Sequence, residues 1–150
     1  MIKLLPSSRV KKLTGLDFKL LEWIIDRVVC ENIGKELRYN ITIHKSRVKD
    51  TSYVVLENRS RDFIIQLDCD SGMRYTIESI LHEIRHIIQH THFKTPVGTA
   101  FKSYRQYYVS QEERDARQFE KLATPVIHMY KAFEKSKVVF EKHNLGTPIK

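Results

Sequence analysis

Hydrophobic residues in the first third of the chain recur with two different periods. Between residues 16 and 28 they recur at the spacing of an amphipathic helix, and this run stops at Asn32 and Gly34. Over residues 37 to 44 they alternate strictly with polar residues, which is the period of a half-buried strand. The pattern therefore predicts a helix followed by a strand.

Two further strands are expected on either side of a polar turn. Residues 53 to 56 and residues 63 to 67 are rich in β-branched and apolar side chains. The polar residues 57 to 62 lie between them, and this arrangement predicts a hairpin.

The order of the elements indicates the class of fold. A helix over about residues 74 to 90 follows the hairpin, and a last helix opens at Ser110 and is interrupted by Pro125. Strands and helices do not alternate, so we expect an α+β fold. In this fold, an N-terminal helix and two later helices would pack on a three-stranded and mainly antiparallel sheet.

Composition supports one domain over residues 1–150. The chain has 41% hydrophobic and 10% aromatic residues, which is enough for a core at this length. It has two cysteines and no Cys-x-x-Cys pair, so a reducing compartment is expected. No stretch reaches the roughly 18 apolar residues of a membrane span. We therefore expect a cytoplasmic protein that has no membrane partner.

The net charge of +8 is concentrated at the two ends of the chain. Residues 1 to 13 carry four Lys and Arg and no acid, and residues 131 to 150 carry five against two acids. We expect these basic N-terminal and C-terminal extensions either to be solvated or to make a weak nucleic-acid contact. The residues concerned are Lys3, Arg9, Lys11, Lys12, Lys131, Lys135, Lys137 and Lys142.

The strongest chemical signal is the motif His82-Glu83-Ile84-Arg85-His86. Histidines four apart on a helix can bind one zinc ion, and the glutamate between them can act as a general base. At about 100° per residue, the two histidines lie within roughly 40° of each other, while the isoleucines of the same helix lie on the opposite side. The sequence therefore predicts a metal site on the polar face of a core-packed helix.

A catalytic zinc usually has three protein ligands, and two residues compete for the third place. His92 lies six residues after His86, but Gln89 occupies the position where a chain turn would need glycine. Glu113 lies in a second helix whose buried stripe starts with Ala116, and a small residue there lets two helices approach closely. Both candidates remain open on this ground.

The chain resembles the ImmA/IrrE type of metallopeptidase, within the broader gluzincins. That family has His-Glu-x-x-His followed by a helix with the pattern Glu-x-Glu-Ala-Asn-x-Phe and a nearby Met-Pro. Here the second helix reads Glu113-Arg-Asp115-Ala116-Arg117-Gln-Phe119, with Arg117 in the place of Asn, and Pro125 follows. The resemblance covers roughly residues 37 to 126.

The resemblance implies a minimal zincin-like domain with a zinc cofactor. His82, His86 and Glu113 would be the metal ligands, and Glu83 would be the catalytic base. The implied activity is hydrolysis of a peptide bond in a protein substrate, for example a DNA-binding regulator. A SprT-like protease that acts on DNA-bound protein is a close variant, in keeping with the basic ends.

Two alternatives from other functional classes remain. A zinc endoribonuclease resembling YbeY would use His82, His86 and His92, although that pattern has glycine where this chain has Glu83 and Gln89. A binding module could also contain the metal site without turnover. The rings of the Tyr104–Tyr108 cluster are expected either to pack their loop onto the core or to provide one phenol that stabilises the oxyanion of the reaction.

Overall fold

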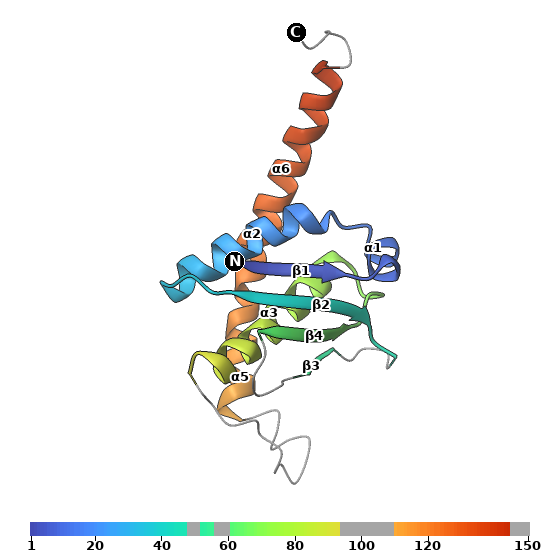
Figure 1. The fold of residues 1–150 in the computed structure, drawn as a ribbon. Coiled ribbons are helices and arrows are strands. Elements are labelled where there is room, and N and C mark those ends of the chain that lie inside the picture. The colour runs from blue at the N-terminus through green and yellow to red at the C-terminus, as the bar shows by residue number, and fades with distance from the viewer. Residues whose placement is uncertain (48–51, 56–60, 94–109, 145–150) are drawn as a thin grey trace.

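The computed structural model of the chain describes residues 1–47, 52–55, 61–93 and 110–144, and for Tyr53, Val55 and residues 137–144 it describes the backbone alone. One sheet lies in front of a group of helices (Figure 1). The elements are β1 (Ile2–Pro6), α1 (Ser8–Thr14), α2 (Phe18–Ile33), β2 (Tyr39–Lys45), β3 (Tyr53–Val55), β4 (Asp62–Leu67), α3 (Met73–Thr91), α5 (Gln111–Phe119), a 3-10 turn η1 (Glu120–Leu122) and α6 (Ala123–Asn144).

Within the described residues, the sheet has four strands in the order β1-β2-β4-β3. β1 is parallel to β2 with Ile2 opposite Tyr39, and β2 is parallel to β4 with Ile41 opposite Phe63. The short edge strand β3 is antiparallel to β4. Helices α1 and α2 form the connection between β1 and β2, as a parallel pair requires.

The chain is α+β, but the expected three-stranded, mainly antiparallel sheet is wrong. The expected hairpin is present, since β3 pairs with β4. However, β4 lies between β3 and β2, and the pair β2 and β4 is parallel. The fourth strand, β1, lies in the basic N-terminal segment, where no strand was expected. Its buried residues Ile2 and Leu4 alternate with Lys3, which is a short strand signal.

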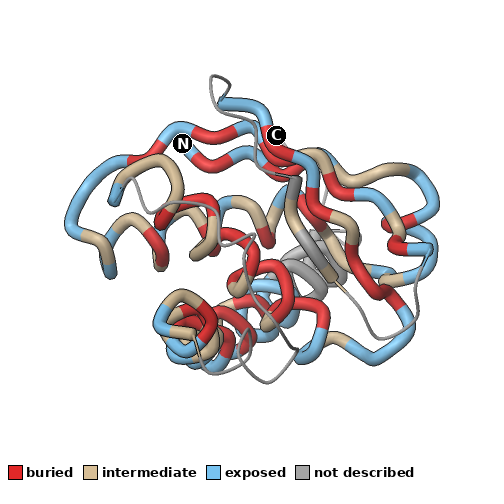
Figure 2. Tube along the Cα trace, turned by 90° about the horizontal axis from the view of Figure 1, so that it is seen from below, coloured by how far each residue is buried: buried red, intermediate tan, exposed pale blue. Residues whose placement is uncertain are grey.

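One face of the sheet is buried under helices and the other is exposed. Buried and exposed positions alternate along the strands (Figure 2), as in β2, where Ile41 and Ile43 are fully buried and His44 is exposed. Helices α2 and α3 pack behind this buried face, and α6 packs on both of them (Figure 1). A single hydrophobic core joins these layers, from Ile2 on β1 to Tyr130 on α6.

Helix α2 begins and ends where the sequence predicts. Asp17 is its N-cap and accepts a hydrogen bond from the backbone N–H of Leu20 at 3.2 Å. Gly34 ends the helix in the left-handed conformation, with φ of 77°. The buried Tyr130 hydroxyl accepts a hydrogen bond from the backbone N–H of Asp17 at 2.8 Å, and so ties α6 to the start of α2.

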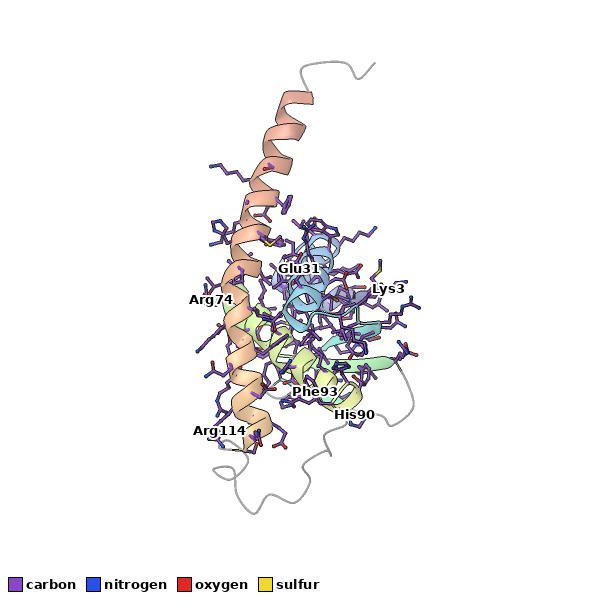
Figure 3. All side chains as sticks on the ribbon, turned by 90° about the vertical axis from the view of Figure 1, so that its left-hand side faces the viewer. Lys3, Glu31, Arg74, His90, Phe93 and Arg114 are labelled. Carbon is purple, nitrogen blue, oxygen red and sulfur yellow. The ribbon has the colours of Figure 1, made fainter. Side chains whose placement is uncertain are left out.

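Helix α6 extends beyond the rest of the molecule (Figure 3). Residues 131–136 are all exposed, and Phe133 packs edge-on against Trp23 of α2, with ring centroids 5.3 Å apart. Among the described residues, no helix has the length and apolar character needed to cross a bilayer.

Two carboxylates of α2 cover the outer edge of β1. The Asp26 carboxylate accepts a hydrogen bond from the backbone N–H of Ile2 at 2.7 Å, and Glu22 accepts one from the N–H of Leu4 at 2.8 Å. Both N–H groups point away from β2, so they have no partner strand. An unpaired strand edge is a template for association with another chain, and these side chains close it.

We predict that Glu22→Ala destabilises the fold by about 1–3 kcal/mol, because it leaves a partly buried backbone donor without an acceptor. The matched control is Glu31→Ala on the same helix, whose ion pair with Arg27 is solvent-exposed and contributes about 0–1 kcal/mol. Urea unfolding of both variants measures the difference. Equal losses of unfolding free energy would show that the β1 edge does not depend on Glu22.

Candidate metal centre

Helix α3 carries the histidine motif on its partly exposed side. Ile80, Ile84 and Ile87 of this helix are fully buried in the core. The side chains of His82 and His86 each retain 16% exposure, on the side that faces α5. The isoleucines thus fix the rotation of the helix, and this rotation directs both imidazoles toward α5.

Helix α5 brings a glutamate to these imidazoles. Ser110 is the N-cap of α5, and its hydroxyl accepts a hydrogen bond from the backbone N–H of Glu113 at 3.3 Å. This places Glu113 in the first turn, where the helix dipole favours a carboxylate. Ala116, one turn later, is fully buried, and its small side chain lets α5 lie close to α3.

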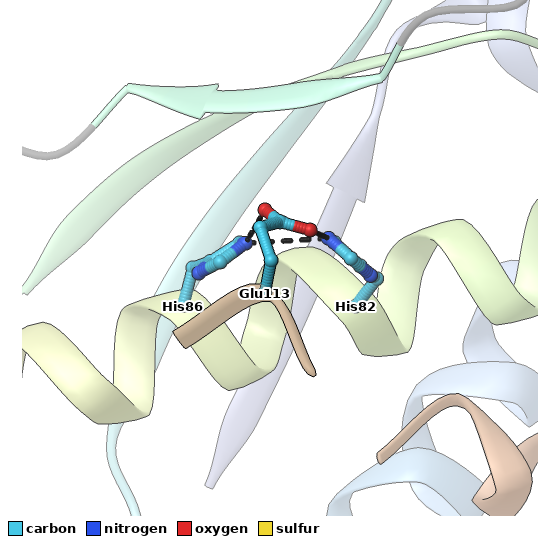
Figure 4. A group of neighbouring side chains, drawn as sticks. All are labelled: His82, His86 and Glu113. Atoms are coloured by element: carbon cyan, nitrogen blue, oxygen red, sulfur yellow. Dashed lines mark hydrogen bonds and ion pairs between the residues drawn. The ribbon is translucent and has the colours of Figure 1, made fainter. Parts of the chain in front are cut away.

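The Glu113 carboxylate bridges the two histidines (Figure 4). Its Oε1 lies 2.7 Å from His86 Nε2, and its Oε2 lies 3.0 Å from His82 Nε2. The two Nε2 atoms are 3.2 Å apart. Potential ligand atoms of His82, His86 and Glu113 all lie within 4.8 Å of one another, so this group could bind a metal ion.

The other candidates for a third ligand lie outside this group. Among the described residues, His82, His86 and Glu113 form the only such set of three or more potential metal ligands, and it excludes His92. His92 follows the last turn of α3, and its ring contacts that of Phe93. The Tyr104–Tyr108 cluster lies outside the described residues.

Acidic side chains around the two imidazoles favour positive charge. Burial lowers the pKa of His82, but its hydrogen bond to Glu113 and its contact with Glu120 outweigh burial and raise the pKa to about 10. The pKa of His86 is also raised, because the Glu113 hydrogen bond and the charge of Glu83 outweigh burial. A metal ion that binds here would compete with protons for the imidazole nitrogens.

Glu83 is buried on the same helix. It is 4% exposed, and burial raises its pKa to about 7, although the nearby His82 and His86 act in the opposite direction. A carboxyl group with such a pKa can both accept and release a proton near neutral pH.

A second layer of polar contacts supports His86. Gln89 Oε1 lies 2.9 Å from His86 Nδ1, and the Gln89 amide also contacts Asp115 of α5. Arg85 in turn binds Asp115, with Nε 2.7 Å from Oδ2. Partial burial raises the pKa of Asp115, but the hydrogen bonds from Arg85 and Gln89 outweigh this and lower it. No local spacing in the sequence indicates that Asp115 is the partner of Gln89.

The donor set fits a divalent transition metal. Imidazole nitrogens and one carboxylate are ligands that zinc commonly takes, and three protein ligands leave a coordination position open. The hydrogen bond at His86 Nδ1 leaves Nε2 on the side of the Glu113 carboxylate. The side chains present are therefore suited to the metal that the motif implies.

Comparisons of this chain with family models, with curated proteins and with solved structures find no match.

We predict that Glu113→Gln and His86→Ala each weaken binding of Zn²⁺ or Co²⁺ by at least about tenfold, because each removes one of three donors. Competition with a chromophoric chelator measures the affinity. Glu112→Gln is the matched control on α5, and His92→Ala is the control on α3. A larger loss in His92→Ala than in Glu113→Gln would assign the third ligand to His92 instead.

Proposed function

We propose that the protein is a zinc-dependent metallopeptidase that hydrolyses a peptide bond in a protein substrate. The observation that carries the proposal is the convergence of Glu113 on His82 and His86, with the buried Glu83 between the two histidines in sequence. Its resemblance to the ImmA/IrrE metallopeptidases rests on the same residues.

Each residue of the group has a role in this proposal. His82, His86 and Glu113 would hold the zinc ion. When bound, zinc supplies Lewis acidity, which polarises the scissile carbonyl and makes water more acidic. Glu83 accepts a proton from the attacking water as the new C–O bond forms. It then gives this proton to the leaving nitrogen as the C–N bond breaks, so the carboxylate is regenerated.

An edge strand next to the site supports a protein substrate. β3 forms one edge of the sheet, and within the described residues no strand pairs with its outer side. β3 also packs near α3, the helix that carries Glu83. An extended peptide could add to this edge by backbone hydrogen bonds, which is independent of its side chains.

The ribonuclease alternative needs a different ligand set. A site like that of YbeY would use His92, and the described group has Glu113 in that place. A silent binding module would have the same ligands as a peptidase, and would differ from it in not depending on Glu83. A variant at Glu83 therefore separates a peptidase from a binding module.

We predict that Glu83→Gln retains zinc and the fold but lowers the rate of hydrolysis by about 10²–10⁴-fold, because the amide cannot accept a proton. Cleavage can be followed by mass spectrometry with a denatured protein such as casein as the first probe. Glu78→Gln, on the same helix and outside the metal group, is the control. Unchanged turnover in Glu83→Gln with bound zinc would reject the peptidase mechanism.

The basic N-terminal segment also forms part of a cavity. Ser7 and Arg9 line a cavity of about 450 Å³ together with residues 44–47, and none of these described lining residues is acidic. It brings Arg9 together with Lys45 and Arg47. We propose that this cavity makes the nucleic-acid contact expected from the basic ends, through phosphate groups.

We predict that Arg9→Ala combined with Arg47→Ala weakens binding to duplex DNA and makes it less dependent on salt. The slope of log affinity against log salt changes by roughly 0.9 for each phosphate that the variant no longer neutralises. Lys19→Ala combined with Lys35→Ala removes the same charge elsewhere and is the control. Fluorescence anisotropy measures both, and identical slopes in the two double variants would remove the cavity from DNA binding.

A further inference from the structure

We infer that Gln89 is a positioning residue for the metal site, held in place by Asp115 and Arg85. It would fix the ring orientation and the tautomer of His86, so that Nε2 is free to bind a metal ion. The inference rests on the metal site proposed above. It adds a row of three hydrogen-bonded side chains, from Gln89 to Asp115 to Arg85, of which only Arg85 belongs to the histidine motif.

The hydrogen bonds of Gln89 determine which way its amide faces. Gln89 Nε2 lies 2.9 Å from the backbone carbonyl of Glu112 and 2.8 Å from Oδ2 of Asp115. A carbonyl and a carboxylate can only accept, so the NH₂ group of the amide must face them. The amide oxygen therefore faces His86 Nδ1 at 2.9 Å.

This orientation in turn fixes the proton on His86. The Gln89 oxygen can only accept a hydrogen bond, so Nδ1 of His86 must carry a hydrogen and donate it. The other nitrogen, Nε2, then points at Glu113, 2.7 Å away, on the side where a metal would bind. Histidines that bind metals commonly have their second nitrogen held in this way.

Asp115 is itself held on its other side. The Arg85 guanidinium donates from Nε at 2.7 Å and from Nη2 at 3.3 Å to the two oxygens of the Asp115 carboxylate. The guanidinium carbon of Arg85 lies 5.1 Å from the ring centroid of Phe93 and 5.0 Å from that of Phe119. Ring contacts of this kind stabilise a cation, so Arg85 has little freedom to move.

The same three side chains also align the two helices of the site. Arg85 and Gln89 belong to α3, and both reach Asp115 on α5. Asp115 follows Glu113 by two residues on α5. The contacts that orient His86 therefore also set the distance from α3 to Glu113. Loss of Gln89 or Asp115 should weaken metal binding although neither residue is a ligand.

The first test is the affinity of the full chain for Zn²⁺. We expect Gln89→Met to bind Zn²⁺ about 10- to 100-fold more weakly than wild type, as is typical when the partner of a metal-bound histidine is removed. The matched control is Gln118→Met, at an exposed position of α5. If the wild type binds Zn²⁺ and Gln89→Met binds it as tightly as Gln118→Met, the inference is overturned.

An exchange of the two polar groups separates orientation from simple packing. Gln89→Glu places two carboxylates against each other and should bind Zn²⁺ weakly. Adding Asp115→Asn returns an N–H between positions 89 and 115 and leaves an acceptor for Arg85, so the double variant should bind more tightly than Gln89→Glu alone. If the double variant binds no better than this single variant, the hydrogen-bond chain has no such role.

The tautomer has its own spectroscopic signature. In Zn²⁺-loaded protein with ¹⁵N-labelled histidine, the His86 ring should show a protonated Nδ1 whose hydrogen exchanges slowly with solvent. In Gln89→Met this hydrogen should exchange faster, while the signals of His82 change little. A His86 ring that binds Zn²⁺ through Nδ1 would overturn the inference. A wild-type chain with no affinity for Zn²⁺ would instead reject the proposed function itself.

Discussion

The close approach of α5 to α3 is the contact on which the candidate site depends. Neither helix contains the group alone, since α3 carries two imidazoles and α5 carries the carboxylate. The approach is possible because Ala116 is small and fully buried, and because Asp115 lies against Arg85 and Gln89. A larger residue at Ala116 would separate the helices and would take Glu113 away from both histidines.

The charge balance of the site follows from the same contact. Glu83 and Glu113 are each 4% exposed, and burial of two carboxylates is costly unless cations lie beside them. The imidazoles of His82 and His86 lie beside these carboxylates, which explains why the pKa values of both imidazoles are raised. Without metal, the carboxylates lie beside imidazoles whose pKa values they raise. With metal, a dication would compensate the same carboxylates.

Local signals in the sequence predicted α2, α3, the start of α5 and the face that carries the histidines, but they did not predict α1. The cap at Asp17, the cap at Ser110 and the isoleucine stripe of α3 each depend on residues within a few positions of one another. The spacing from Glu113 to Ala116 indicated the inner face of α5 for the same reason.

What the sequence did not reveal depends on contacts between distant residues. Alternation along β2 and β4 is the same whether the two strands are parallel or antiparallel, so it could not give the strand order. β1 is five residues long and ends at Pro6, so it has few positions in which to show a pattern. The placement of Arg85 between Phe93 and Phe119 brings residues of α3 together with α5, and no local spacing records it.

The covered edge of β1 also limits how copies of this chain can associate. A sheet with two open edges can grow in both directions and build a fibre, because each added copy presents a fresh edge. Glu22 and Asp26 occupy one edge, so among the described strands only the β3 side can still accept a strand. Two copies joined at β3 would use up the only open edge that these strands leave on each sheet. Association by strand pairing would therefore stop at a symmetric dimer.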